Sequence, residues 1–158
     1  GTGSANLDRV TITGGGATGT GVVMEGTEMM TMNMVNISEV QTGIQVTSGN
    51  LTVNGGSMTG VQTGITMLGS GTLTVNNGAR IEFTGEYGVK VGDRVTMASL
   101  TDVKITGTSG GTGKGVEVSI ESSKTMTMAK VDISNVAMGV EVKRGILAMK
   151  GGSIGFTG

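Results

Sequence analysis

The chain has 158 residues and a formal net charge of −1 at pH 7, and it contains no cysteine, histidine, proline or tryptophan. Without cysteine and histidine it can form no disulfide, no zinc site built from those ligands, no thiol nucleophile and no imidazole base. The near-neutral charge without a basic run argues against a nucleic-acid-binding protein, and no apolar stretch reaches the roughly 18–20 residues of a transmembrane helix.

The chain begins with Gly1-Thr2-Gly3-Ser4 and lacks an initiator methionine, so residues 1–4 are expected to be an expression remnant. The remainder contains many of the 31 glycines but also short runs in which every second residue is apolar. Disordered chains combine low hydrophobicity with high net charge, whereas 36% of these residues are hydrophobic and the charge is nearly balanced. We therefore expect an ordered, all-β chain.

A motif of the form Gly-[Val/Ile]-x-[Val/Met] recurs along the chain, and successive copies begin at Gly21, Gly43, Gly64, Gly88, Gly115 and Gly139. Two further apolar pairs, each separated by one residue, lie between successive copies. The first set comprises Ala5/Leu7, Met30/Met32, Leu51/Val53, Leu73/Val75, Val95/Met97, Met126/Met128 and Leu147/Met149. The second set comprises Val10/Ile12, Val35/Ile37, Gly56/Met58, Ile81/Phe83, Val103/Ile105, Val131/Ile133 and Gly152/Ile154.

Three short strands per repeat predict a right-handed, single-stranded parallel β-helix of about seven coils, each of about 22 residues. Side chains alternate between the two faces of a strand, so the paired apolar residues line the interior and the residue between them faces outward. Gly158 falls midway through the repeated pattern. We therefore expect residues 5–158 to be one β-helix fragment truncated at its C-terminal end.

The predicted outward positions carry charge only in the later coils. The residues between the two inward positions of the second strand are, in successive coils, Thr11, Asn36, Ser57, Glu82, Lys104, Asp132 and Ser153. The corresponding residues of the third strand are Val23, Gln45, Thr66, Lys90, Glu117 and Glu141. Charges of alternating sign at Glu82, Lys104 and Asp132 are expected to set the register weakly. Glu117 beside Glu141 brings like charges together, and we expect the two side chains to splay into water. Neutralisation by Lys143, by a divalent ion or by a basic partner is the alternative.

Additional residues enlarge the same corner of the predicted coil twice, at Thr13–Thr20 and at Thr106–Lys114, and a third insertion, Ser119–Lys124, leaves the opposite end of a strand. Repeat proteins often bind partners through insertions of this kind. The residues predicted to contact a partner are Thr106, Thr108, Ser109, Thr112, Lys114, Lys90 and Lys104. The alternative is that the segment is a disordered insertion with no function.

An enzymatic function is not expected, although many parallel β-helices cleave acidic polysaccharides. Such enzymes need clusters of carboxylates for calcium binding or acid–base catalysis. The predicted register brings no three carboxylates together on one face, and neither Gly14-Gly15-Gly16 nor the glycine-rich segment before Lys114 has the spacing of a phosphate-binding loop. We therefore predict no catalytic residue, no cofactor and no metal.

Repeats such as Asn50-Leu51-Thr52-Val53-Asn54-Gly55-Gly56 and Thr72-Leu73-Thr74-Val75-Asn76-Asn77-Gly78 resemble the passenger domains of type V autotransporters, the pertactin-like β-helices. The methionine-rich unit Thr125-Met126-Thr127-Met128 is most similar to the inducible autotransporters of Bartonella, a family that includes a secreted angiogenic factor. The resemblance implies a passenger that is secreted or displayed on the bacterial cell surface.

The same resemblance implies an adhesin or virulence ligand that binds a host cell-surface protein, receptor or matrix, or a glycan. The alternatives are a purely structural stalk or a polysaccharide-active enzyme. No contact with nucleic acid or membrane is expected from this segment. Because the end coils of a solenoid need caps, we also expect fraying at Thr2–Leu7 and end-to-end self-association.

Overall fold

Short β-strands make up nearly all of the described chain, and their burial alternates as expected from the apolar pairs. The computed structural model describes residues 3–16, 18–26, 29–108 and 113–156. Within these residues there are strands and no helix. The strands are β1 (Ser4–Asp8), β2 (Thr11–Thr13), β3 (Thr20–Met24), β4 (Met29–Asn33), β5 (Asn36–Ser38), β6 (Thr42–Val46), β7 (Asn50–Asn54), β8 (Ser57–Val61), β9 (Thr63–Met67), β10 (Gly71–Asn76), β11 (Ala79–Phe83), β12 (Tyr87–Val91), β13 (Val95–Gly107), β14 (Lys114–Ser119), β15 (Thr125–Val136), β16 (Met138–Arg144), β17 (Ile146–Lys150) and β18 (Ser153–Phe156).

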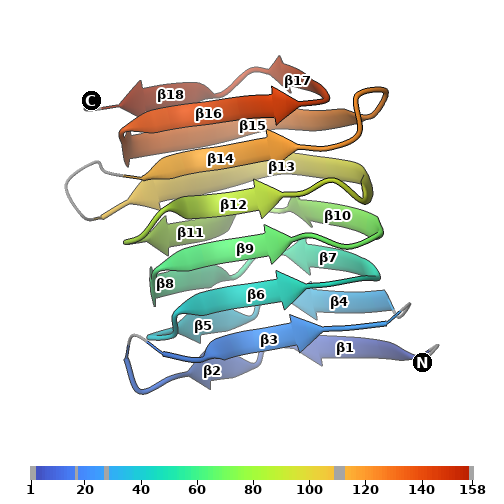
Figure 1. Ribbon diagram of the computed structural model, residues 1–158. Coiled ribbons are helices and arrows are strands. Elements are labelled where there is room, and N and C mark those ends of the chain that lie inside the picture. The colour runs from blue at the N-terminus through green and yellow to red at the C-terminus, as the bar shows by residue number, and fades with distance from the viewer. Residues whose placement is uncertain (1–2, 17, 27–28, 109–112, 157–158) are drawn as a thin grey trace.

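Every strand pairs in parallel with the equivalent strand one coil away, so the chain is a parallel β-solenoid (Figure 1). The third strands of the coils form a six-stranded sheet in the order β16-β14-β12-β9-β6-β3. The first and second strands form a 12-stranded sheet, because β13 and β15 each continue through the corner between them. The described chain thus has six complete turns, with β17 and β18 starting a seventh, close to the predicted number of coils.

The recurring glycine motif sets the register of the six-stranded sheet as predicted. Val89 of β12 pairs with Ile65 of β9 and with Val116 of β14, and all three side chains are fully buried. The apolar interior runs continuously along the stack as one cluster of aliphatic, thioether and few aromatic side chains. The packing of one coil against the next therefore gives the fold its core.

Glycine is the second residue of each third strand because the second strand of the next coil packs directly against it. A Cβ atom on Gly64 would lie 2.4 Å from the carbonyl oxygen of Gly88 and 2.6 Å from Cγ2 of Ile81. A Cβ on Gly115 would lie 2.5 Å from Cγ2 of Ile133 and 2.6 Å from the carbonyl oxygen of Gly139. Since backbone atoms cannot move aside easily, the motif requires glycine for this close approach.

The corner between the first and second strands has a left-handed backbone in every coil. The residues in this column are Arg9 (φ 58°), Met34 (φ 53°), Gly55 (φ 68°), Asn77 (φ 60°), Asp102 (φ 56°), Lys130 (φ 55°) and Gly151 (φ 66°). Most of them have side chains and would not adopt this conformation without the hydrogen-bonded ladders on both sides. Glycine and asparagine at Val53-Asn54-Gly55 and the aspartate at Asp102 are typical of such a corner, whereas Lys130 is not.

The prediction that Val95 and Met97 form the inward pair of the fifth coil is wrong. A register shift after Gly71 places Ala98 opposite Leu73, and Leu100 lies opposite Val75. Val95 is still buried, but Met97 is 52% exposed. The alternation shifts by one residue because Gly71 pairs with Val95 whereas Thr72 pairs with Met97, so that a β-bulge in β13 accommodates the additional residue Thr96.

The predicted register of the second strand in the fourth coil is also wrong, by two residues. Ala79 pairs with Val103 and Ile81 pairs with Ile105, so Ala79 and Ile81 occupy the positions assigned to Ile81 and Phe83. Arg80 therefore takes the outward position assigned to Glu82, beside Lys104. The predicted alternation of charge through Glu82, Lys104 and Asp132 does not exist, because Lys104 lies between a like charge and Asp132.

Candidate functional site

The predicted partner-binding residues divide between two faces of the solenoid and one corner. Lys90 of β12 and Lys114 of β14 lie together on the six-stranded sheet, with their ammonium groups 5.0 and 5.7 Å from the centre of the Tyr87 ring. Lys104 lies on the other sheet, where it lines a depression of about 190 Å³ with Arg80, Asp102 and Asp132. The structure therefore brings Lys90 and Lys114 together but separates Lys104 from them.

The threonines at the corner before β14 make contacts within the solenoid. The Thr106 and Thr108 side chains are held by neighbouring coils: Thr106 Oγ1 lies 3.4 Å from Ser134 Oγ, and Thr108 Oγ1 donates to the Phe83 carbonyl at 3.1 Å. Ser109 and Thr112, also predicted to contact a partner, lie outside the described residues. The described part of this corner is thus bound to β11 and β15 of the neighbouring coils.

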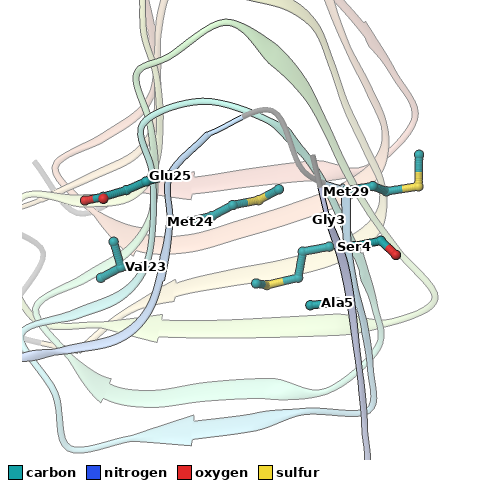
Figure 2. A pocket seen from close by; sticks show the side chains of 8 residues that line it. Gly3, Ser4, Ala5, Val23, Met24, Glu25 and Met29 are labelled. Atoms are coloured by element: carbon teal, nitrogen blue, oxygen red, sulfur yellow. The ribbon is translucent and has the colours of Figure 1, made fainter. Parts of the chain in front are cut away.

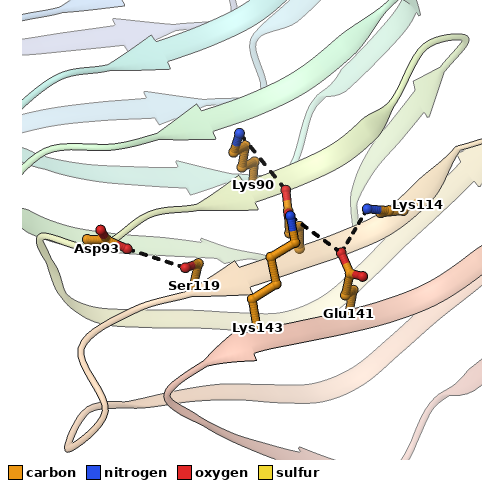
Figure 3. A network of polar contacts seen from close by, with 7 residues as sticks. Lys90, Asp93, Lys114, Ser119, Glu141 and Lys143 are labelled. Carbon is orange, nitrogen blue, oxygen red and sulfur yellow. Dashed lines mark hydrogen bonds and ion pairs between the residues drawn. The ribbon is translucent and has the colours of Figure 1, made fainter.

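A network of charged side chains that includes Lys90, Lys114, Glu141 and Lys143 lies on the six-stranded sheet (Figure 3), and ion pairs with Lys90 and Lys143 place Glu117 within it. Lys143 Nζ lies 2.5 Å from Glu117 Oε1 and 3.9 Å from Glu141 Oε1. Lys114 Nζ donates to Glu141 Oε1 at 2.7 Å, and Lys90 Nζ lies 4.0 Å from Glu117 Oε2. We call Tyr87, Lys90, Lys114, Glu117, Glu141 and Lys143 the Glu117 network.

The prediction that Glu117 and Glu141 splay into water is wrong for Glu117. The two glutamates are neighbours in the ladder, as predicted, but the Glu117 side chain is only 2% exposed. The alternative that Lys143 neutralises the pair is confirmed, and Lys90 and Lys114 also contribute. Within the described residues, Glu117 Oε2 is buried without a hydrogen-bond partner.

The network changes the proton affinity of its members in opposite directions. Burial raises the pKa of Glu117, but the hydrogen bond from Lys143, the nearby Tyr87 hydroxyl and the lysine charges outweigh it, so the pKa falls below its ordinary value. Burial, and then the negative charge of Glu117, raises the pKa of Tyr87. Hydrogen bonds to the glutamates raise the pKa of Lys114 and Lys143. Glu117 therefore stays ionised and both lysines stay charged at neutral pH.

A depression of about 360 Å³ adjoins the network on the same sheet, with Lys90, Glu117 and Lys143 in its wall. Leu68, Gly92, Asp93, Arg94 and Ser119 complete the wall. Ser119 Oγ donates to Asp93 Oδ1 at 3.3 Å and so orients that carboxylate. Three cationic side chains face two carboxylates here, so the depression carries a small excess of positive charge.

The insertion Ser119–Lys124 is anchored to the core. Ile120 is 1% exposed, and its backbone N–H donates to the Arg144 carbonyl at 3.1 Å. A turn closed by the hydrogen bond from Lys124 N to the Glu121 carbonyl follows. This segment holds Ser119 at the edge of the depression.

Sequence reasoning missed Tyr87, Asp93 and Arg94 as members of this surface. The stacked pair Glu117 and Glu141 was the available signal, because two adjacent like charges require cations near them. No group of three or more aspartates or glutamates within the described ranges is placed to hold a metal ion. No helix long and apolar enough to cross a membrane occurs in that part of the chain.

Comparisons of the chain with protein-family models, with curated proteins and with solved structures find no match.

Proposed function

We propose that this chain is part of an extracellular passenger of the pertactin-like kind, secreted or displayed on a bacterial surface, which binds a protein or matrix component of a host cell. The β-solenoid is compatible with such a passenger. The single observation that carries the binding proposal is the Glu117 network, in which side chains from three consecutive coils are held in one charged surface. The Bartonella-like adhesin, virulence or angiogenic role is the specific form of this proposal.

A network built around a buried, ionised carboxylate is a costly way to hold a solenoid together. Burying a carboxylate requires compensating charges, and well-packed apolar residues often stabilise a protein equally well. Glu117 instead holds Lys143, and Glu141 holds Lys114, so the ammonium groups at this face have restricted positions before a partner arrives. Preorganised charges favour specific recognition, because fewer side chains lose freedom on binding.

A structural stalk is the second candidate, and the regular stacking of the coils favours it. Six similar turns with one continuous apolar interior suit a rigid spacer that holds a binding region elsewhere. A stalk needs no specialised face, so the two candidates differ in whether the Glu117 network contacts a partner.

The experiment measures saturable binding of the purified chain to endothelial and epithelial surface proteins. The variant Lys90→Gln/Lys114→Gln removes two cations from the network face, and the control Lys104→Gln/Lys130→Gln removes two exposed cations from the other sheet. We expect the first variant to weaken binding by roughly tenfold and the control to retain it. Absence of saturable binding by the unmodified chain would favour the stalk.

Two further measurements separate the remaining alternatives. Tyr87 is the single tyrosine and there is no tryptophan, so intrinsic fluorescence reports directly on a ligand that reaches the network. Incubation with polygalacturonate tests both glycan binding and cleavage. Product formation would establish an enzyme and overturn the binding proposal, whereas a fluorescence change without product would identify an acidic glycan as the partner.

A further inference from the structure

A tight turn after β12 presents two charged side chains beside the Glu117 network. The backbone N–H of Val95 donates to the Gly92 carbonyl at 3.2 Å and closes the turn, whose central residues are Asp93 and Arg94. Gly92 packs against Leu68 of the preceding coil, since a Cβ atom on Gly92 would lie 3.0 Å from Leu68 Cδ2. The base of the turn is therefore held in place, while both charged side chains are exposed.

The depression of about 360 Å³ that adjoins the network includes this turn in its wall, and we call it the Arg94 depression. Lys90, Arg94 and Lys143 supply its cations, and Asp93 and Glu117 supply its carboxylates. These charges leave an excess of one positive charge, which a ligand with a single negative group would balance. The volume falls within the roughly 300–1,000 Å³ of small-ligand sites.

The two carboxylates of the depression can accept hydrogen bonds from a ligand. Glu117 Oε2 is buried without a hydrogen-bond partner among the described residues, and Lys90 Nζ is 4.0 Å away, too far for such a bond. Ser119 Oγ donates to Asp93 Oδ1 and orients that carboxylate (Figure 3). An ionised carboxylate has about four lone-pair sites, so Asp93 can accept further donors. A ligand with hydroxyl groups would supply the donors that both carboxylates lack.

Arg94 is the cation of this wall that is available to an anionic ligand. Lys90 and Lys143 both face Glu117, whereas no ion pair with Arg94 occurs within the described residues. A guanidinium group binds a carboxylate through two parallel N–H donors. Leu68, which is 43% exposed, adds an apolar surface to the same wall. The ligand that matches these groups has one carboxylate, several hydroxyls and an apolar face.

Two other depressions of the described chain lack this combination. The depression of about 260 Å³ beside β1 and β4 has Glu25 as the one charged side chain among its described lining residues, so it offers an anion no cation (Figure 2). In the depression on the other sheet, Arg80 and Lys104 are balanced by two aspartates, and the apolar side chain in its wall, Val103, is buried.

We propose that the Arg94 depression binds one uronate residue of an acidic glycan. Arg94 binds the carboxylate, Glu117 Oε2 and Asp93 accept hydrogen bonds from the ring hydroxyls, and Leu68 contacts the C–H groups of the ring. This inference rests on the proposed function, because it identifies the matrix component of the host cell as a carboxylated glycan. A sulfated glycan fits less well, since its additional oxygens bring more negative charge toward Asp93 and Glu117.

Isothermal titration calorimetry of the full chain tests the ligand class with four oligosaccharides. Hyaluronate hexasaccharide and tetragalacturonate carry uronates of animal and plant origin, heparin hexasaccharide also carries sulfates, and maltohexaose is neutral. We expect hyaluronate to bind saturably and more tightly than tetragalacturonate, and maltohexaose not to bind. Heparin should bind roughly fivefold more weakly than hyaluronate, because its sulfates are repelled by the two carboxylates.

Two substitutions test the assigned contacts. Arg94→Gln should weaken hyaluronate binding by roughly tenfold or more, whereas Arg80→Gln, at an exposed position on the other sheet, should leave it unchanged. Asp93→Asn removes a negative charge and would strengthen a merely electrostatic attraction to a polyanion. If Asp93 accepts hydroxyl donors, this substitution should instead weaken binding by roughly threefold or more, because a neutral amide is the poorer acceptor. Circular dichroism verifies that each variant is folded.

Absence of saturable binding to both uronate glycans, or equal binding of maltohexaose, would overturn the inference. Tighter binding of heparin than of hyaluronate, or stronger binding by Asp93→Asn, would also overturn it, because either is the behaviour of a surface that attracts any polyanion. Binding of tetragalacturonate without hyaluronate would overturn the assignment to an animal matrix.

These outcomes are separate from those for the proposed function. A chain that binds endothelial or epithelial surface proteins but neither uronate glycan would keep the proposed function and lose this inference. A chain that binds a uronate glycan in the calorimeter, with the expected loss in Arg94→Gln, but binds no host surface would keep the uronate site and lose the proposed function.

Discussion

Lys143 Nζ lies 2.5 Å from Oε1 of Glu117, whose side chain is only 2% exposed although it occupies an outward position of its strand. The two residues come from neighbouring coils, β14 and β16. A buried carboxylate is tolerated only when cations compensate for its lost hydration. This ion pair therefore determines whether the surrounding face is stable.

Replacing Lys143 with methionine keeps the aliphatic part of the side chain but removes the charge. We expect Lys143→Met to lower the free energy of unfolding by about 1–3 kcal/mol, because Glu117 would lose its shortest hydrogen bond. Urea unfolding measures the change. Lys104→Met, at an exposed position on the other sheet, should cost less than about 0.5 kcal/mol. Equal effects of the two substitutions would contradict the role of the ion pair.

The lowered pKa of Glu117 predicts a stability change in acid. The contribution of its carboxylate is fully present above the ordinary pKa of 4.5 and is lost as the pH falls through the lower pKa of the folded state. The stability difference between the unmodified chain and Glu117→Gln should therefore be constant at neutral pH and shrink in acid. A difference that does not change as the pH falls would show that Glu117 is not preferentially ionised in the folded state.

The raised pKa of Tyr87 predicts the opposite change in alkali. Its contribution to stability is present below pH 10.0 and is lost as the pH rises through the higher pKa of the folded state. Because Tyr87 is the single tyrosine, tyrosinate absorbance gives its midpoint directly. We expect a midpoint above 10.0 that moves downward in Glu117→Gln, since the negative charge of Glu117 is one cause of the increase. An unchanged midpoint would leave burial and the charge of Glu86 as the causes of the increase.

The corrected register of β13 can be tested by introducing a charge at two adjacent positions. Met97 is 52% exposed and Ala98 is 1% exposed. We expect Met97→Glu to change stability by less than about 0.5 kcal/mol, whereas Ala98→Glu should cost more than about 3 kcal/mol or prevent folding. Thermal unfolding compares the two variants. A greater loss of stability in Met97→Glu than in Ala98→Glu would support the register first predicted from the sequence.

Packing between coils should dominate over the threonines on the outer face. Ile105 is fully buried between Ile81 and Ile133, so Ile105→Ala should lower the free energy of unfolding by roughly 2–5 kcal/mol. Thr74→Ala removes a partly exposed hydroxyl and should cost less than about 1 kcal/mol. Denaturant unfolding measures both changes. A larger loss from Thr74→Ala would mean that the outer ladder stabilises the coil more than the interior does.

The third strands show what local pattern can predict. Each carries its own glycine, which the close approach of the next coil requires, and two inward apolar residues follow at a spacing that cannot be shifted without losing the glycine. Val89, Val116 and Val140 could therefore be aligned across coils from the sequence, and their pairing is confirmed.

The first and second strands lack such a marker, and there the prediction failed. Val95, Met97, Ala98 and Leu100 offer two apolar pairs, and local alternation does not distinguish them. The choice depends on the neighbouring strand β10 and on the bulge between them. The same ambiguity led to the prediction that Glu82 lies beside Lys104, a position that Arg80 occupies.

The parallel three-stranded coil and the position of Glu117 beside Glu141 in the ladder could be read from the residue order, because alternation within a strand and the repeat between coils are both properties of the linear chain. The burial of Glu117, the approach of Tyr87 and Lys90 from one side and of Lys143 from the other, and the location of Lys104 on another sheet depend on the folded chain. Burial and charge pairing depend on side chains from coils more than 20 residues apart, and their directions follow from packing that no local pattern encodes.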